Sequence, residues 1–511
     1  MKRLFLFIPL FLFSYQVNLA EMLTKPKSYV RDFYLTEFMR ETNQSDLAYK
    51  AYYSLYKPRM KHLKILSKKF DFFKPIYRCV NPSPKDIRNI DIACVLNNGL
   101  WLSSMARLGP EDLIYLYSKL PDGREKKAVW AFLNKDFSNV FKSASLGYYF
   151  ILRYPSKRID QKITNFRPFY GKYFHLFVKS AAKHDLPLIQ KSINRLNYKY
   201  FSDKTKWWMF LIAMKLKDEK RAQNILKSMK KTSKVNFWLW QLTGDKKYLN
   251  ELLKSNRVNF YTLYAYEEAH KNFKIYNKIL FNTVKKPKYD QTNPWDVLKF
   301  WDEFRRRKDL FKFAKELDCP KSEALKALVL DKAHHYVRNY FITPKMYEDK
   351  DKRFKAFVYA IARQESRFIP ASVSSSYALG TMQIMPFLVR AMKGDVFNQF
   401  DYDENIRLGA KHLRWLFKRL DNPLMVAYAY NGGIGFVKRR VLPKFRYKGK
   451  YEPFLSMENV VYDESREYGK KVIANYVIYS KLFGKPVTLH ELLGKKIPPK
   501  EKKVKEKKVK K

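Results

Sequence analysis

The sequence predicts a mainly α protein, in which a long stack of helical hairpins precedes a second, shorter helical domain. Amphipathic runs with apolar residues every three or four positions recur through residues 21–330, and strand-like alternation is scarce. Only six of the sixteen glycines lie in that span, whereas the other ten follow residue 340. Short turns and the lack of a strict sequence period favour stacked hairpins over a regular repeat array.

The first twenty residues have the pattern of a secretory signal peptide. A basic head, Met1-Lys2-Arg3, precedes an apolar run from Leu4 to Phe13, which is too short to span a bilayer. Ala20 is the small residue near which we expect cleavage. These features predict a soluble, exported protein of the periplasm, where it meets cell wall rather than nucleic acid.

The charge balance is strongly basic. Lys and Arg number 102 against 48 acids, for a formal charge of +54, and such a field attracts polyanions. No Walker loop, zinc-finger spacing or RNP-like pattern is present, so nucleic-acid binding is a minor alternative. Most lysines are expected on solvated helix faces, from which they can make weak electrostatic contact with acidic wall or a membrane surface.

The cysteines and tryptophans allow simple structural interpretations. Cys79 and Cys94 form a disulfide or remain apart, since the sequence alone does not show that they meet, and Cys319 is expected to be a buried apolar residue. The cysteine spacing does not fit a zinc site, and we expect neither metal nor cofactor. Several tryptophans occur at helical spacing, which favours a place in the core over a role in stacking on sugars. They are Trp207, Trp208, Trp238, Trp240, Trp295 and Trp301.

A helical stripe in the second domain carries an acid. Its apolar positions recur with the three- and four-residue spacing of one helix face: Phe354, Phe357, Val358, Ile361 and Phe368. Glu365 falls on the same face, where loss of solvation should raise its pKa. The alternatives are a surface glutamate that pairs with a nearby arginine and one that lies in water at the edge of the stripe.

Two glycine turns follow this stripe. Gly380 breaks the helical pattern and allows backbone to pass close to a bound group. The segment 427–433 (Ala-Tyr-Ala-Tyr-Asn-Gly-Gly) ends a helical run among aromatic and amide side chains. Flat apolar faces and side-chain amides are the components of sugar-binding sites.

These segments resemble the catalytic domain of the soluble lytic transglycosylases, lysozyme-like enzymes that cleave peptidoglycan. That family has E-S-x-F, then S-x-x-G-A-x-G-L-M-Q-x-M-P, then A-Y-N-x-G, then E-T-R-x-Y. The chain supplies matching elements in the same order: Glu365–Phe368, Ser374–Pro386, Asn405–Ala410, Ala429–Gly433 and Glu464–Tyr468.

The resemblance implies an architecture as well. It implies an N-terminal α-superhelix, curled into a ring or horseshoe, that carries a lysozyme-like, mostly helical catalytic domain. We therefore expect a superhelical domain with its linker over residues 21–340 and a catalytic domain over 341–490. Residues 491–511 read as a basic, disordered tail, in which positions 500–511 hold eight lysines and two glutamates.

The resemblance also implies the chemistry. The chain is expected to act on peptidoglycan glycan strands with Glu365 as single acid and base. The 2-acetamido oxygen of N-acetylmuramic acid would stabilise C1, and its C6 hydroxyl would close onto C1 to give a 1,6-anhydro end without water. Acting as acid and then base requires a pKa near the working pH, raised to about 6 as in the lysozyme glutamate.

Roles for the remaining site residues come from the same resemblance. Ser374 and Gln383 would contact the N-acetyl group or the glutamate, and Met385 would wall the pocket. Tyr430 and Asn431 would hold the sugar and the glutamate. Tyr468 would cover the site, and Glu464 would contact the amine of the wall peptide. Simpler alternatives stay open: Met385 as core filler, Asn431 as a helix C-cap, and Glu464 as the partner of Arg466.

The chain departs from the family pattern at four positions. Tyr377 stands in place of glycine, Thr381 of leucine or methionine, Ser465 of threonine and Gly469 of valine. A hydrolytic lysozyme-like muramidase and a non-catalytic wall-binding scaffold are therefore alternatives to the transglycosylase. We expect a monomer, and the sequence does not distinguish action at strand ends from internal cleavage.

Overall fold

The computed structural model describes residues 17–100, 102–105, 107–134, 174–183, 187–281 and 286–495. The described chain is almost entirely helical, and its two strands are β1 (Ile275–Tyr276) and β2 (Asn339–Tyr340), which pair in parallel. The predicted mainly α class is confirmed. The predicted leader overlaps the description only at its end, where helix α1 spans the expected cleavage point near Ala20. Of the predicted basic tail, residues 496–511 lie outside the described ranges.

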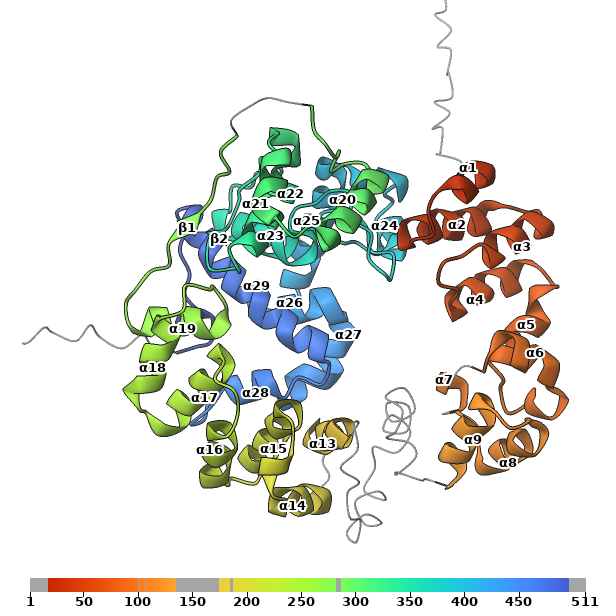
Figure 1. The fold of residues 1–511 in the computed structure, drawn as a ribbon, viewed down its shortest axis with the longest axis horizontal. Helices are drawn as coiled ribbons and strands as arrows, with labels where there is room; N and C mark the ends of the chain where they lie inside the picture. The colour runs from red at the N-terminus through yellow and green to blue at the C-terminus, as the bar shows by residue number, and fades with distance from the viewer. Residues whose placement is uncertain are drawn as a thin grey trace, which may run out of the picture.

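Short helices packed as successive hairpins make up the N-terminal part and form an arc along the right of Figure 1. These helices are α1 (Leu19–Thr24), α2 (Tyr29–Glu41), α3 (Ser45–Tyr53), α4 (Met60–Lys69), α5 (Phe73–Val80), α6 (Ile92–Asn98), α7 (Leu102–Met105), α8 (Pro110–Lys119) and α9 (Arg124–Asn134). Neighbours such as α4 and α5, or α8 and α9, bury their apolar faces against each other.

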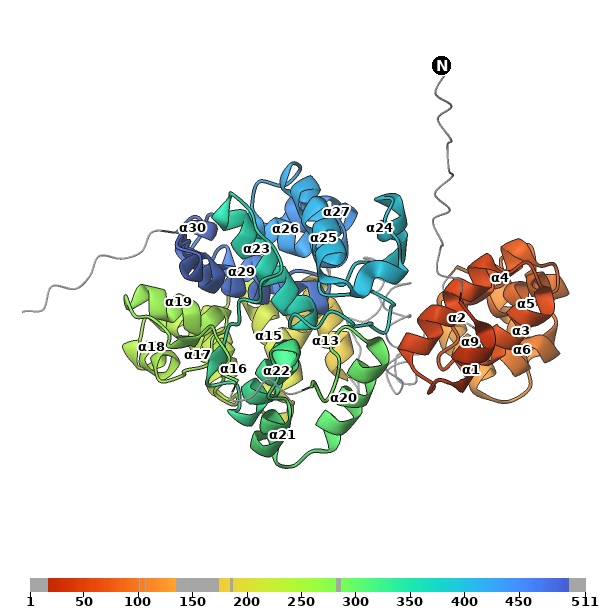
Figure 2. The same ribbon diagram turned by 90° about the horizontal axis from the view of Figure 1, so that it is seen from above.

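A second set of hairpins follows and lies beside the C-terminal domain in both views (Figures 1 and 2). It comprises α13 (Phe174–Lys183), α14 (Pro187–Arg195), α15 (Asp203–Lys215), α16 (Glu219–Lys227), α17 (Ser233–Thr243), α18 (Lys246–Leu253), α19 (Phe260–Glu268), α20 (Pro294–Arg306), α21 (Leu310–Glu316) and α22 (Glu323–Ala333). Helix α20 begins as its sequence predicts, because the Asn293 side chain accepts from the Trp295 N–H and Pro294 occupies the first helical position.

The C-terminal domain is built around a packed pair of long helices, α23 and α29. Its helices are α23 (Lys352–Ser366), α24 (Pro386–Ala391), α25 (Tyr402–Phe417), α26 (Pro423–Gly432), α27 (Ile434–Phe436), α28 (Phe454–Glu458), α29 (Asp463–Leu482) and α30 (Leu489–Leu492). Phe357 of α23 meets Tyr476 of α29 edge to face at 5.2 Å. Asp401 caps α25 by accepting from the Glu404 N–H.

Shorter helical turns complete the described chain. They are η1 (Ile87–Asn89), η2 (Tyr198–Tyr200), η3 (Pro320–Ser322), η4 (Phe397–Phe400), the π-turn η5 (Val437–Val441) and η6 (Leu442–Lys444). None of the helices within the described ranges is both long and apolar enough to cross a bilayer.

The cysteines and tryptophans resolve as structural residues. Cys79 and Cys94 form a disulfide with a Cα–Cα distance of 6.1 Å, which settles the question the sequence left open. Cys319 is free and buried, as expected. Trp207, Trp208 and Trp238 are buried, and the other three named tryptophans are partly buried against the core, which confirms the core interpretation.

The helical stack contacts the C-terminal domain at several separated places. Lys183 of α13 reaches Asp463 at the start of α29 at 2.7 Å, and Tyr261 of α19 donates to Glu458 of α28 at 2.6 Å. From the other end of the stack, Tyr377 of the C-terminal domain lies 3.2 Å from His62 of α4. The C-terminal domain is therefore contacted by both N-terminal sets of hairpins.

Candidate active site

Glu365 lies in the last turn of α23, which ends at Ser366 with Arg367 in the left-handed region at φ 57°. The apolar stripe of α23 is buried as predicted, and Glu365 at its end is partly exposed. Its hydrogen-bond partner is Tyr468 of α29, whose hydroxyl donates to Glu365 Oε1 at 2.6 Å. Because α23 and α29 pack along their lengths, the acid and the phenol are held on a rigid pair of helices.

The arginines beside Glu365 do not neutralise it. Arg363 and Arg367 instead pair with Asp331 at the end of α22, at 3.4 and 2.7 Å. Among the residues that the structure describes, Glu365 forms no salt bridge. The alternative of a surface glutamate paired with a nearby arginine is therefore wrong.

The electrostatic surroundings raise the pKa of Glu365 to about 7. Loss of solvation is the largest cause, and the nearby charge of Glu464 adds to it. The hydrogen bond from Tyr468 acts the other way, since it favours the ionised carboxylate. The predicted rise is confirmed, and near neutral pH both protonation states of Glu365 are populated.

The end of α26 brings the second group of predicted residues to the start of α29. Asn431 Nδ2 donates to Glu464 Oε1 at 3.3 Å, and the Ser465 hydroxyl donates to Asn431 Oδ1 at 2.6 Å. Ser465 thus holds Asn431 even though it replaces the threonine of the family pattern. Tyr430 is partly exposed, and its hydroxyl donates to the Met382 carbonyl at 2.7 Å. Burial and the charge of Glu365 raise the pKa of Tyr430 well above its usual value.

A tight loop over residues 372–385 carries Ser374 and Gln383. The Ser374 hydroxyl accepts from the backbone N–H groups of Ser376 and Ala378, at 3.2 and 2.9 Å. The Gln383 amide donates to the carbonyls of Ser372 and Gly380, at 3.0 and 2.8 Å. Both side chains brace the loop, and the structure records no direct contact of either with Glu365.

Gly380 meets the steric demand that its sequence context predicts. Its φ is 77°, and a Cβ there would lie 2.2 Å from the Gln399 carbonyl oxygen and 2.4 Å from Asn405 Nδ2. Only glycine fits this close approach.

Two further residues support the loop, and sequence reasoning gave neither a role. Asn405, buried in α25, accepts from the Met382 N–H at 2.7 Å and donates to the Leu379 carbonyl at 3.0 Å. The Ser366 hydroxyl donates to the Thr381 carbonyl at 2.8 Å and so joins the loop to the residue after Glu365. Their positions inside matched motifs were the available signal, since Asn405 opens one and Ser366 follows the acid in another.

One departure from the family pattern has a direct steric explanation. A Cβ at position 469 would lie 2.2 Å from the ring of Tyr428. Gly469 therefore lets α29, which carries Tyr468, approach the fully buried Tyr428 of α26.

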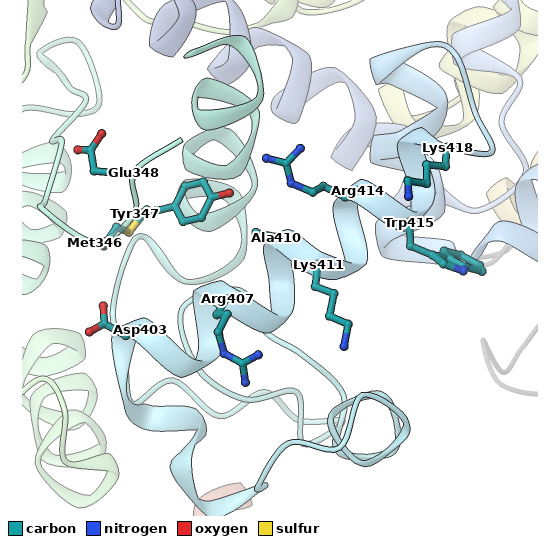
Figure 3. A pocket seen from close by; sticks show the side chains of 10 residues that line it. All are labelled: Met346, Tyr347, Glu348, Asp403, Arg407, Ala410, Lys411, Arg414, Trp415 and Lys418. Atoms are coloured by element: carbon teal, nitrogen blue, oxygen red, sulfur yellow. The ribbon is translucent and has the colours of Figure 1, made fainter. Parts of the chain in front are cut away.

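A cavity of about 680 Å³ on the outer face of α25 contains none of the predicted site residues (Figure 3). Two of its cations are paired, Arg407 with Glu404 and Arg414 with Asp349, and Figure 3 shows Arg414 directed towards Tyr347. We assign this cavity no part in the site.

Met385, expected to wall the site, is partly exposed as the residue that precedes α24. In the described ranges no group of three or more His, Cys, Asp or Glu is arranged to hold a metal ion.

Comparison with known proteins finds a family that is similar to the region around Glu365. The family described as "Transglycosylase SLT domain" matches residues 343–452. The chain is 28% identical over 162 residues to the "Soluble lytic murein transglycosylase" of Escherichia coli (strain K12), covering 29% of this chain and 25% of that protein. A relative of the same name from Salmonella typhimurium is 29% identical over 146 residues, covering 26% and 22%. The match spans about a quarter of the length of these curated relatives.

Solved structures of lytic transglycosylases are also similar to this chain. An inactive mutant of "Lytic Transglycosylase Slt" from Pseudomonas aeruginosa is 17% identical, with a TM-score of 0.46 and coverage of 90% of this chain and 75% of that one. The complex of the 70-kDa soluble lytic transglycosylase with bulgecin A is 14% identical, with a TM-score of 0.45 and coverage of 93% and 91%. On the sequence match, residues 343–452 of this chain are similar to the transglycosylase SLT domain family.

Proposed function

We propose that the protein is a lytic transglycosylase that cleaves the β-1,4 bond between N-acetylmuramic acid and N-acetylglucosamine in peptidoglycan, with Glu365 as its single acid and base. One observation carries the proposal. A carboxyl group with a pKa of about 7, free of salt bridges among the described residues and bonded to Tyr468, lies inside the matched SLT region. Such a group can deliver a proton and later take one back without a change of pH.

In the first step, protonated Glu365 gives its proton to the glycosidic oxygen. The bond between that oxygen and C1 breaks, and its electron pair leaves with the oxygen of the departing N-acetylglucosamine. The 2-acetamido oxygen of the same N-acetylmuramic acid stabilises the positive charge at C1, so a second carboxylate is not required. Tyr468 then stabilises the Glu365 anion through its hydrogen bond.

In the second step, ionised Glu365 accepts the proton of the C6 hydroxyl. Oxygen O6 bonds to C1, the acetamido oxygen withdraws, and the sugar leaves as the 1,6-anhydro form. Glu365 is again protonated and ready for the next turnover. No water is consumed and no cofactor is used.

The other residues act on the substrate around this acid. We place Tyr430 and Asn431 at the sugar, Tyr468 over the glutamate and Glu464 near the amine of the wall peptide. Ser374 and Gln383 present their loop to the N-acetyl group, and Met385 adds an apolar wall. Asn431 is fixed on both sides by Glu464 and Ser465, which supports a positioned rather than mobile amide.

The wider setting is proposed with the activity. The protein would work as a monomer in the periplasm on peptidoglycan glycan strands. Seven cations follow the end of α27 without an intervening acid: Lys438, Arg439, Arg440, Lys444, Arg446, Lys448 and Lys450. All of them are exposed, and this surface supports weak, salt-sensitive contact with acidic wall or membrane surface.

The test compares wild type with Glu365→Gln on purified sacculi. We expect Glu365→Gln to lose turnover by at least about 10²-fold, since a positioned acid–base group contributes 10²–10⁴-fold, while sacculus binding at low salt persists. Mass spectrometry of the soluble wild-type products should find 1,6-anhydro ends.

Glu219→Gln is the matched control, because Glu219 lies on α16 in an exposed pair with Lys450. It should turn over as the wild type does. Products that carry the mass of added water would identify a hydrolytic muramidase instead. Binding without any turnover by the wild type would identify a non-catalytic wall-binding protein.

A further inference from the structure

Tyr377 has a backbone conformation that its side chain does not favour. Its φ is 70°, in the left-handed region, where the lytic transglycosylase pattern has glycine. A bulky residue at this φ costs free energy that glycine avoids. The side chain is nonetheless 2% exposed, so it is fixed by its contacts rather than directed into solvent.

The contacts that fix Tyr377 come from α4 of the N-terminal stack. Its hydroxyl lies 3.2 Å from His62 Nε2, and the two rings are stacked at 5.9 Å. The Arg59 N–H donates to His62 Nδ1 at 3.0 Å. Burial and then the charges of Lys61 and Arg59 lower the pKa of His62 to about 3, so the ring is neutral. Since Nδ1 is an acceptor, the proton sits on Nε2 and is donated to the Tyr377 hydroxyl.

A cation and further interface contacts strengthen this attachment. Lys61 Nζ lies 3.5 Å from the centre of the Tyr377 ring and donates to the Ser376 carbonyl at 3.4 Å. Beside it, Phe33 of α2 packs against Phe397 at 6.1 Å. Helices α2 and α4 thus meet the C-terminal domain at and beside Tyr377.

The loop that Tyr377 belongs to reaches the catalytic acid through a chain of backbone bonds. The Tyr377 N–H donates to the Ser374 carbonyl at 2.9 Å, and the Gly380 N–H donates to the Ser372 carbonyl at 3.0 Å. Gln383 closes the loop onto the same Ser372 carbonyl. The carbonyl of Thr381 accepts from Ser366, the residue after Glu365. Tyr377 therefore lies inside a braced loop that is bonded, through Thr381, to the residue after Glu365.

We propose that Tyr377 is a positioning residue, through which α4 of the N-terminal stack holds the loop 372–385 in place beside Glu365. The free-energy cost of Tyr377 in place of glycine is then offset, because the buried Tyr377 side chain gains contacts with α4. The inference rests on the proposed function for its effect on turnover, but not for its effect on the loop. It assigns the helical stack a direct part in shaping the site.

The test uses Tyr377→Gly, Tyr377→Phe and His62→Ala in the full chain. Glycine relieves the backbone strain and restores the family residue, so a role in local strain alone predicts equal or better activity. If Tyr377 positions the loop, Tyr377→Gly should raise amide exchange in residues 372–385 about tenfold. It should also lower kcat on sacculi about tenfold with KM nearly unchanged.

The other variants define the contact. Tyr377→Phe keeps the ring under Lys61 but removes the acceptor of His62, so its effects should be smaller, about threefold. His62→Ala combined with Tyr377→Gly should be no worse than Tyr377→Gly alone, because both remove one contact. Where His62→Ala does not fold, the two Tyr377 variants decide the question.

Tyr451→Phe is the matched control. Tyr451 donates to Glu219 at 2.8 Å, so this variant removes a phenol hydroxyl at another contact between stack and C-terminal domain. It should leave loop exchange and kcat unchanged. Wild-type exchange and turnover in Tyr377→Gly would overturn the proposal. If the wild type proves inactive on sacculi, the exchange measurement still decides whether α4 holds the loop.

Discussion

Glu365 and Glu458 are two glutamates of the C-terminal domain that both lose solvation, yet their pKa values shift in opposite directions. The pKa of Glu365 rises to about 7, with a phenol as its partner. Glu458 of α28 is 2% exposed and accepts from Lys470 at 3.1 Å. Lys234 lies 3.3 Å from it. Although burial alone would raise it, these cations hold the pKa of Glu458 well below its usual range.

The comparison teaches that the absence of cations, rather than burial alone, makes a glutamate fit to carry a proton. This chain has 102 Lys and Arg residues, so a carboxyl group stays free of cations only where the nearby ones pair with other acids. Asp331 contributes to it by pairing with both Arg363 and Arg367, which flank Glu365 in sequence. Glu458, in contrast, serves to join α17 and α19 to α29.

The largest expected effect comes from removing the charge of Glu458. Glu458→Gln leaves Lys470 and Lys234 buried without a full counter-charge. Breaking a buried ion pair from one side costs about 3–5 kcal/mol of unfolding free energy. Urea unfolding at pH 7 should show this loss, while turnover per folded molecule should change little.

The control for that loss is Glu219→Gln. Glu219 also joins the helical stack to the C-terminal domain, through Lys450, but its side chain is 38% exposed. A surface pair of this kind contributes about 0–1 kcal/mol. Equal losses for the two variants would contradict the distinction between a buried and an exposed contact.

Replacing Glu365 by Gln should increase the unfolding free energy, whereas Glu458→Gln decreases it. Because the folded pKa of Glu365 is raised to about 7, the folded protein binds more protons than the unfolded chain between about pH 4.5 and pH 7. The wild type therefore loses stability as pH rises through that window. Glu365→Gln removes the titration, so it should be more stable than the wild type by about 3 kcal/mol at pH 8.

Thermal and urea unfolding at pH 4.5, 6 and 8 check this. The difference between Glu365→Gln and wild type should shrink towards pH 4.5, where both side chains are neutral in the folded protein. A difference independent of pH would show that the carboxyl group titrates like a free one, and the acid–base assignment would fall with it.

Local patterns in the sequence predicted the parts of this comparison that local physics determines. The three- and four-residue spacing placed Glu365 on the apolar side of α23, and the loss of solvation expected there predicted the direction of its pKa shift. Asn293 and Asp401 cap the starts of α20 and α25, which is a local effect because capping involves only the next three residues. The mainly α class followed from the same periodicity.

The rest depends on contacts between distant residues, which leave no periodic signal. His62 and Tyr377 are 315 positions apart, and nothing near either residue indicates the other. Asp331 lies in another helix, α22, and forms the ion pairs with Arg363 and Arg367 that keep these arginines from pairing with Glu365. Cys79 and Cys94 were close enough in sequence to pair, but only the 6.1 Å between their Cα atoms shows that they do.

The smallest expected effects are shifts of the pKa of Glu365, and the larger of them comes from losing the Tyr468 hydrogen bond. Tyr468→Phe removes a hydrogen bond to the ionised carboxylate, so the pKa of Glu365 should rise further. The alkaline limb of the pH profile of kcat/KM on sacculi should then move up by on the order of one pH unit. Turnover at the optimum should fall as well, because the Glu365 anion formed in the first step loses its donor.

Glu464→Gln is the counterpart with the opposite sign. Its negative charge raises the pKa of Glu365, and removing that charge should move the alkaline limb down. Glu464 is exposed, so this shift should be smaller than that of Tyr468→Phe and should shrink in high salt. If the alkaline limb moves in the same direction in both variants, a group other than Glu365 controls the pH profile. The lack of cations that distinguishes Glu365 from Glu458 would then not explain the chemistry.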